Sequence, residues 1–232
     1  MLQEVFFKDL GIIEYGEAWK FQESLLFENA ELKKQAANGL IVESTKHHLL
    51  FCEHPPVYTL GKSGKEEHVL ISKEELSKRN IAYYETNRGG DITFHGPGQI
   101  VGYPILDLEK YYRDIGRYLR SLEEVIILAL HEYGIKGERS KGETGVWIDS
   151  ENKLKARKIC AMGVRCSRWI TMHGFALNVN TNLDYFTMIV PCGIPDKQVT
   201  SIQKELGVEI DINETKKIIK NKFEQVFECT IN

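Results

Sequence analysis

The chain has 232 residues, of which 42% are hydrophobic and 27% are charged, and its formal net charge is −3 with a pI near 6.2. This length suits one α/β domain that needs no disulfide or metal to stabilise it. The slightly acidic balance disfavours a nucleic-acid-binding protein, which usually has a high pI and a basic face. The longest apolar stretches are too short to span a bilayer, so we expect no membrane contact.

Cysteine usage and the first residues predict a reduced, cytoplasmic protein. The five cysteines are odd in number and irregularly spaced, and MLQEVFFKDLGIIEY lacks the basic region and apolar run of a signal peptide. Cys160 and Cys166 are too far apart for the usual zinc spacing, and no carboxylate–His pair is suitably spaced. We therefore expect no metal site.

The first half of the chain mixes helical and strand patterns. Apolar residues at helical spacing predict a helix over 17–37, which ends at Asn38-Gly39. The elements that follow in chain order are a buried strand at 49–52, a helix at 72–79 capped by Ser72 with Glu75 as its capping-box partner, a strand at 81–86, a glycine-rich segment at 88–98 around a short strand, and a strand at 99–108.

The second half begins with a helix and is then richer in strands. The predicted elements are a helix at 114–133 ended by Gly134, a strand at 145–149, a hairpin of 158–166 and 169–180 joined near Ser167-Arg168, a loop at 181–194, a helix at 201–206 ended by Gly207, and a helix at 213–229 capped by Asn213. This order predicts a single mixed-sheet α/β (α+β) domain over 1–232. A separate small C-terminal subdomain from about residue 190 is an alternative that the sequence leaves open.

The segment RGGDITFHGPG, residues 88–98, carries four glycines, which let the backbone approach a ligand closely. It matches neither GxxxxGK[ST] nor GxGxxG, so it predicts no phosphate loop. Composition alone leaves a tight loop between strands and a binding loop equally open. Arg88 and His95 place a charge and a titratable group beside the glycines, which favours a site.

Two further residues are candidates for chemistry. Cys192 lies between Pro191 and Gly193, outside any periodic apolar face, and a cysteine attacks as a thiolate if a base or cation is close. Lys158 opens a predicted strand, where a lysine is most often a solvated edge residue and otherwise a cation that stabilises a thiolate. His173, like His95, precedes a glycine and fits an acid–base group, a ligand or a hydrogen-bonded strand residue.

In combination these segments resemble the lipoyl(octanoyl) transferase family from about residue 15 to residue 210. The matching segments are HPPVYTLG, RGGDITFHGPGQIVGYPILDL, GVWI, KICAMGVRC, MHGFALNVN and PCGI, in this order. The chain departs from the family at Asp91, where a neutral glutamine-type residue is common, and at Phe94, where a tyrosine is frequent.

The resemblance implies a fold related to biotin protein ligases and lipoate–protein ligases. It implies transfer of octanoyl from octanoyl-acyl carrier protein to a lysine of apo lipoyl domains or glycine cleavage H protein, with no cofactor. The family's thioester-forming cysteine falls on Cys192 and its thiolate-tuning lysine on Lys158. The substrate-binding residues it implies are Arg88, Gly89, Gly90, Asp91, Ile92, Thr93, Phe94, His95, Ala161, Met162, Gly163, Gly174, Phe175 and Ala176.

Other functions stay open beside this one. An ATP-dependent lipoate or biotin protein ligase shares the implied fold but forms an acyl-adenylate and needs no cysteine. A noncatalytic binding protein for acylated domains and a thioester hydrolase are weaker alternatives. We also expect the basic residues between Lys153 and Arg168 to form a docking patch for acidic partner proteins.

Overall fold

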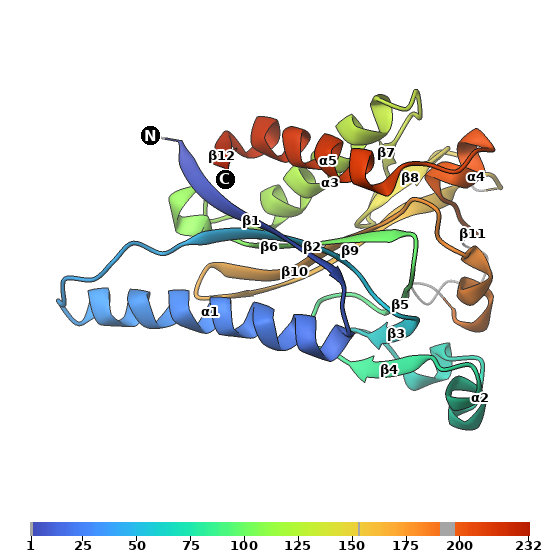
Figure 1. Ribbon diagram of the computed structural model, residues 1–232, viewed down its shortest axis with the longest axis horizontal. Coiled ribbons are helices and arrows are strands. Elements are labelled where there is room, and N and C mark those ends of the chain that lie inside the picture. Colours follow the sequence, from blue (N-terminus) through green and yellow to red (C-terminus); the bar gives the residue numbers. More distant parts are fainter. Residues whose placement is uncertain (1, 153, 191–197) are drawn as a thin grey trace.

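The computed structural model describes residues 2–152, 154–190 and 198–232. Figure 1 shows a layered arrangement in which the long helix α1 (Tyr15–Ala37) lies on one face of a central sheet. Helices α3 (Ile115–His131) and α5 (Ile212–Phe227) lie on the other face. Among the residues described, no helix is both long and apolar enough to cross a membrane.

The central sheet of the described chain has nine strands in the order β12-β1-β2-β6-β10-β9-β8-β7, with β11 beside β9. The pairs β12–β1, β1–β2 and β11–β9 are parallel and the others are antiparallel, which confirms the predicted mixed sheet. The strands are β1 (Gln3–Ile12), β2 (His47–Glu53), β6 (Gln99–Ile105), β7 (Glu138–Arg139), β8 (Val146–Ile148), β9 (Arg157–Ser167), β10 (Ile170–Asn178), β11 (Gln198–Val199) and β12 (Cys229–Ile231).

A second, three-stranded sheet of order β4-β3-β5 lies near the N-terminal end of α1 (Figure 1). Its core is aromatic: the ring of Phe94 stacks on Tyr185 with centroids 4.4 Å apart and meets Phe186 edge-on. The elements of this region are β3 (Val57–Leu60), β4 (Ala82–Glu85), β5 (Ile92–His95), α2 (Lys73–Lys78) and the 3₁₀ turns η1 (Glu66–His68) and η3 (Leu183–Met188). The remaining short helices are η2 (Leu108–Lys110) and α4 (Ile202–Leu206).

Helix boundaries follow the predicted capping signals, with two corrections. Ser72 accepts a hydrogen bond from the Glu75 amide at the start of α2, which confirms the predicted cap, but the Glu75 side chain accepts from Arg79 Nε at 2.7 Å instead of completing a capping box. The last helix begins at Ile212 and is capped by Asp211, not by Asn213. The Asp211 carboxylate accepts hydrogen bonds from two successive backbone N–H groups, and Asn213 lies within the first turn.

Strand β1 was not predicted because it lacks a clear alternation of buried and exposed residues. Only Val5 of its ten residues is buried. The predicted hairpin of β9 and β10 is confirmed, and its turn places both Arg168 and Trp169 at positive φ, +52° and +66°. Two consecutive left-handed residues are typical of a type I′ turn, which usually contains glycine or asparagine.

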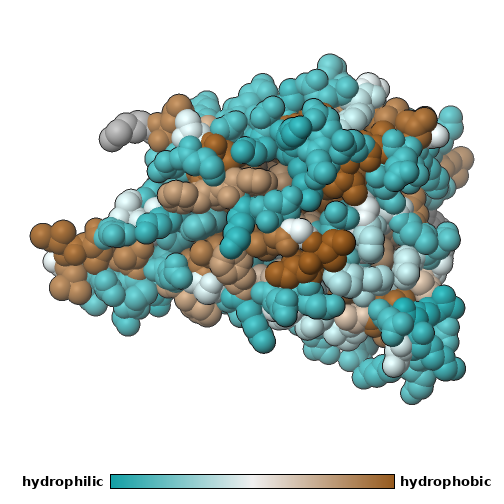
Figure 2. Space-filling view, viewed as in Figure 1, coloured by the Kyte–Doolittle hydropathy of each residue, from teal (hydrophilic) through white to brown (hydrophobic). Residues whose placement is uncertain are grey.

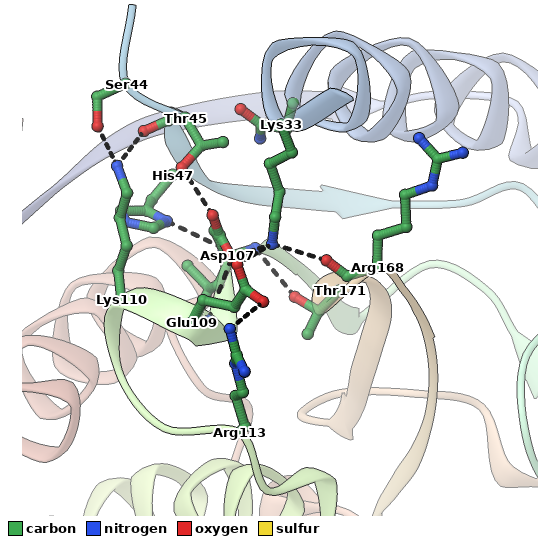
Figure 3. Close-up of polar contacts among 12 residues, drawn as sticks. Lys33, Ser44, Thr45, His47, Asp107, Glu109, Lys110, Arg113, Arg168 and Thr171 are labelled. Atoms are coloured by element: carbon green, nitrogen blue, oxygen red, sulfur yellow. Dashed lines mark hydrogen bonds and ion pairs between the residues drawn. The ribbon is translucent and has the colours of Figure 1, made fainter. Parts of the chain in front are cut away.

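A polar cluster around Asp107 holds this hairpin turn against α1 (Figure 3). The Asp107 carboxylate is 2.9 Å from both Lys33 Nζ and Thr45 Oγ1, and Lys33 also donates to the Arg168 carbonyl. The cluster therefore joins α1, the start of β2 and the β9–β10 turn. Farther along, the loop after α1 exposes Leu40 and Ile41, which accounts for hydrophobic surface at that tip of the molecule in Figure 2.

Candidate active site

A pocket of about 470 Å³ lies between the α1-side face of β6, β9 and β10 and the second sheet. The residues that border it include Tyr15 at the start of α1, Arg88, Gly90 and Asp91 of the glycine-rich segment, and the loop 142–144. Its small or apolar floor residues are Val101, Ala161, Gly163, Gly174 and Ala176. This combination gives a slot next to a rim of polar groups.

Most of the predicted substrate-binding residues border this pocket. They are Arg88, Gly90, Asp91, Ile92, Thr93, His95, Ala161, Met162, Gly163, Gly174, Phe175 and Ala176. Gly89 and Phe94 do not border it: Gly89 donates its N–H to the Val164 carbonyl at 2.9 Å, and Phe94 packs in the aromatic core of the second sheet. Phe175 contributes little side chain, since its ring lies in the core on the other face of the sheet.

Two glycines on the scaffold are required by backbone-to-backbone packing. A Cβ on Gly163 would lie 2.6 Å from the Gly89 carbonyl oxygen, and one on Gly61 would lie 2.2 Å from that of Gly90. The glycine-rich segment therefore lies directly on β9 and β3. The missing side chain of Gly163 makes room for this segment.

The Arg88 side chain binds the scaffold around the glycine-rich segment. Its Nη2 donates to the carbonyl and hydroxyl oxygens of Thr59, at 2.6 and 3.0 Å, and its Nη1 donates to the Gly89 carbonyl at 3.1 Å. The guanidinium is buried, so these bonds stabilise a charge that would otherwise be costly to bury. Arg88 therefore fixes the segment in addition to bordering the pocket.

A chain of hydrogen bonds continues from Thr59 along the pocket floor. His95 is 3.3 Å from the Thr59 hydroxyl through Nε2 and 2.8 Å from Gln99 Oε1 through Nδ1. Gln99 donates to Asn178, and Asn178 donates to the Thr200 carbonyl. Burial, above all, holds the pKa of His95 well below its usual value, so the ring is neutral and serves as a hydrogen-bonding link.

This series of hydrogen bonds ends at β9, the strand that carries Lys158, because the Thr200 N–H donates to the Lys158 carbonyl. Sequence reasoning missed these linking residues. Only the polar Gln99 and Asn178, at the ends of apolar strands, gave a signal that could have identified them. Together they tie the glycine-rich segment to β9.

Lys158 faces the pocket because of a bulge in β9. Trp147 pairs with Lys158 but its neighbour Val146 pairs with Cys160, which leaves Ile159 as an extra residue. Lys158 and Cys160 consequently face opposite sides: Cys160 lies in the core, and Lys158 borders the pocket. The Lys158 ammonium lies 4.6 Å from the centroid of the Trp147 ring, a cation–π contact.

Cys192 lies outside the described residues, as does the rest of 191–197. The described residues on both sides of this segment are close to the pocket. The Val190 N–H donates to the His68 carbonyl at 2.8 Å. Val199 borders the pocket and pairs with Lys158 in the parallel β11–β9 ladder.

Asp91 of the glycine-rich segment is hydrogen-bonded to a residue of η1. His68 Nδ1 lies 2.7 Å from Asp91 Oδ2, and Asp91 Oδ1 also accepts the Ile92 N–H at 2.7 Å. Both side chains are largely buried. The negative charge at position 91 is therefore accommodated by a histidine 23 residues earlier.

The innermost polar groups of the pocket stay neutral. Tyr103 borders the pocket and its hydroxyl lies 2.7 Å from His54 Nε2, while His54 Nδ1 is 2.7 Å from the Ile13 carbonyl. Burial lowers the pKa of His54 to about 4 and raises that of Tyr15 to about 12. A neutral interior suits the apolar part of a ligand.

A buried carboxylate, that of Glu123, holds the loop 142–144 that borders the pocket. Glu123 accepts the Gly145 N–H at 3.0 Å, and it also accepts hydrogen bonds from Arg120 at 2.6 Å and Arg139 at 3.2 Å. Gly145 directly follows the pocket-bordering residues 142–144. Glu123 thus connects α3 to one wall of the pocket.

The predicted basic docking patch is not continuous. Lys153 lies outside the described residues, and Arg157 is paired with Glu205 at 2.6 Å and with Asp149 at 2.5 Å. Arg168 lies in the turn at the far end of β9, about 30 Å along the strand from Arg157. In the part of the chain that the structure describes, no group of three or more side chains is arranged to hold a metal ion.

Comparisons with known proteins agree with this architecture. The model of the lipoyl protein ligase A/B catalytic domain family matches residues 14–224. An octanoyltransferase of Christiangramia forsetii is 54% identical over 233 residues, which cover 100% of this chain and 99% of that protein.

Two solved structures are similar in fold. A bipartite lipoate protein ligase from Thermoplasma acidophilum superposes with a TM-score of 0.70 at 17% identity, covering 100% of this chain and 86% of the other. A biotin protein ligase from Aquifex aeolicus, in complex with biotin and ATP, gives a TM-score of 0.53 at 12% identity, with coverages of 97% and 70%. At these identities the likeness concerns the fold alone, and it confirms the predicted fold relationship.

Proposed function

The chain belongs to the lipoyl protein ligase A/B catalytic domain family, and we propose that it is an octanoyltransferase of protein lipoylation. The donor is octanoyl-acyl carrier protein, and the acceptors are lysines of lipoyl domains and of glycine cleavage H protein. The observation that carries this proposal is Lys158, which borders a slot of small residues in a chain 54% identical, over its full length, to an octanoyltransferase. Ala161 and Ala176, paired across β9 and β10, leave room for an acyl chain there.

In the first half-reaction, the Cys192 thiolate attacks the carbonyl carbon of the octanoyl thioester. The carbon–sulfur bond to the phosphopantetheine sulfur breaks, and that sulfur leaves as a thiolate and takes a proton from the Lys158 ammonium, which becomes a neutral amine. The Lys158 ammonium favours the anionic form of Cys192 by charge, and the Trp147 ring face stabilises this cation. The product is octanoyl-Cys192 and free carrier thiol.

In the second half-reaction, the acceptor lysine attacks octanoyl-Cys192 as a neutral amine. The amide bond forms, the Cys192 sulfur leaves, and Lys158 in its neutral form takes the proton of the amine. Conversion of one thioester into another and then into an amide is thermodynamically favourable, so the reaction consumes no nucleotide. This distinguishes the proposed activity from that of a ligase with the same fold.

The test is transfer to an apo lipoyl domain under two sets of conditions. With octanoyl-acyl carrier protein and no ATP, we expect octanoylation of the lipoyl domain by the wild type and none by Cys192→Ala. With free octanoate and ATP, we expect no octanoylation. Transfer only in the second mixture would overturn the proposal in favour of an ATP-dependent ligase.

A further inference from the structure

His173 combines backbone strain with deep burial. It lies within β10, opposite Val164 of β9, yet its φ is +57°, and its side chain is 2% exposed. A non-glycine residue at positive φ is uncommon, even though histidine adopts it more often than most, and within a strand it persists where the surrounding structure enforces it. Such residues concentrate at functional sites, and His173 borders the pocket.

The His173 ring presents a free lone pair. Its Nε2 lies 2.8 Å from Asn87 Oδ1, an atom that can only accept, so Nε2 carries the hydrogen. Burial first, and then the charges of Arg88 and Arg165, lower the pKa of His173 to about 3, so the ring is neutral near pH 7. Nδ1 is therefore a hydrogen-bond acceptor, and it is buried without a partner.

Two neighbouring side chains on α1 have buried hydrogen-bond donors without acceptors. The Gln22 side chain accepts the His173 N–H at 2.9 Å, but its own Nε2 is buried without a partner. The Trp19 ring lies 6.1 Å from the His173 ring, and its Nε1 is also buried and unpaired. One acceptor and two donors thus stay unsatisfied in one cluster of touching side chains, although buried polar groups are nearly always paired.

This cluster lies at the opposite end of the pocket from Lys158. The pairs Ala161–Ala176 and Gly163–Gly174 follow Lys158 along the β9–β10 ladder, and His173–Val164 is the next pair. All four of these small residues border the pocket. An acyl chain with its carbonyl at Lys158 would therefore point its distal end toward His173.

We propose that His173 forms a polar subsite at the inner end of the pocket, which binds a hydroxyl at the distal end of a medium-length acyl chain. This inference rests on the proposed function, because it assumes that the slot holds an acyl chain. A hydroxyl donates one hydrogen bond, so it would satisfy the buried Nδ1 of His173, the member of the cluster that borders the pocket. The enzyme would consequently transfer ω-hydroxyoctanoyl groups as well as octanoyl.

The test compares the binding of octanoate and 8-hydroxyoctanoate by isothermal titration calorimetry. A purely apolar pocket disfavours an unpaired buried hydroxyl, which costs roughly ten-fold or more in affinity. For the wild type we expect dissociation constants within about three-fold of each other. In His173→Phe, which keeps a ring but removes the acceptor, we expect 8-hydroxyoctanoate to bind at least ten-fold more weakly relative to octanoate. His173→Asn tolerates positive φ and keeps an acceptor, so it should restore part of the ratio.

The outcomes separate this inference from the proposed function. If the wild type binds octanoate but binds 8-hydroxyoctanoate ten-fold or more weakly, the inference is wrong and the acyl slot stands. An unchanged ratio in His173→Phe would also overturn it, because His173 would then be merely structural. If neither acid binds, the acyl slot itself is contradicted. Should His173→Phe not fold, the wild-type ratio still decides.

Discussion

His68 and Asp91 are hydrogen-bonded to each other, with Nδ1 of the imidazole 2.7 Å from Oδ2 of the carboxylate. This contact joins the glycine-rich segment to the 3₁₀ turn η1. The His68 carbonyl in turn accepts the Val190 N–H, directly before the segment that contains Cys192. The pair therefore couples one wall of the pocket to the chain that leads to the proposed nucleophile.

We expect His68 and Asp91 to be energetically coupled. In urea unfolding, Asp91→Asn and His68→Gln should each lower the free energy of unfolding, and the double variant should lose about 1 kcal/mol less than the sum. Asp91→Asn keeps an oxygen that accepts the Ile92 N–H, so the interaction that this variant loses is the charged contact with His68. Effects that add to within about 0.3 kcal/mol would show that the contact contributes nothing to stability.

Gly163 should not tolerate even one added methyl group. In Gly163→Ala the Cβ would overlap the Gly89 carbonyl oxygen, and displacing the glycine-rich segment should cost about 1–3 kcal/mol and weaken octanoate binding. Gly89→Ala is the matched control, because its Cβ would meet only the Val164 carbonyl at 3.5 Å. Thermal unfolding and calorimetric binding measure both effects. Equal behaviour of the two variants would contradict the packing described here.

The Glu123 carboxylate should contribute more to the free energy of unfolding than the carboxylate of its neighbour Glu124. Glu123→Gln weakens the hydrogen bonds that the fully buried carboxylate accepts, although Arg120 and Arg139 are themselves partly exposed, and this should cost about 1.5–3 kcal/mol of unfolding free energy. Glu124 pairs with Arg139 at 2.5 Å but is partly exposed, so Glu124→Gln should cost less than about 1 kcal/mol. The comparison fails if chemical denaturation ranks the two variants equally.

Acid should destabilise the fold through buried neutral histidines. Burial lowers the pKa of both His47 and His54 to about 4, whereas the unfolded chain has values near 6.5. Between pH 6.5 and 4 the unfolded state therefore binds more protons. Stability is complete above this window and falls as the pH drops through it, by about 1.4 kcal/mol per pH unit for each such histidine.

The check on this pH dependence is its slope. Urea unfolding between pH 6.5 and 4.5 should give a His54→Gln variant whose stability declines less steeply than that of the wild type, by about one proton. The absolute stability of the variant does not matter for this comparison. Identical slopes would mean that His54 titrates normally in the folded protein.

Periodic segments made much of the fold predictable. The helices α1 and α3, the Ser72 cap of α2 and the β9–β10 hairpin follow from apolar spacing and capping residues that act locally. Strand β1 was missed because its burial depends on neighbours in the sheet, and only Val5 is covered.

The site was harder to predict because its geometry depends on residues distant in the sequence. Lys158 faces the pocket only because β8 pairs with β9 through a bulge, and strict alternation would have placed it on the same side as Cys160. The role of Gly163 depends on the Gly89 carbonyl, and Asp91 depends on His68. None of these partners is adjacent in sequence.

The most direct test of the central claim is the mass of the enzyme itself during turnover. The purified protein, incubated with octanoyl-acyl carrier protein and no lipoyl domain, should gain the mass of one octanoyl group on Cys192, identified by peptide mapping. An apo lipoyl domain added afterwards should discharge it. If the lipoyl domain is octanoylated with no acyl-enzyme at any time point, and Cys192→Ala transfers as fast as the wild type, the thioester route proposed here is contradicted.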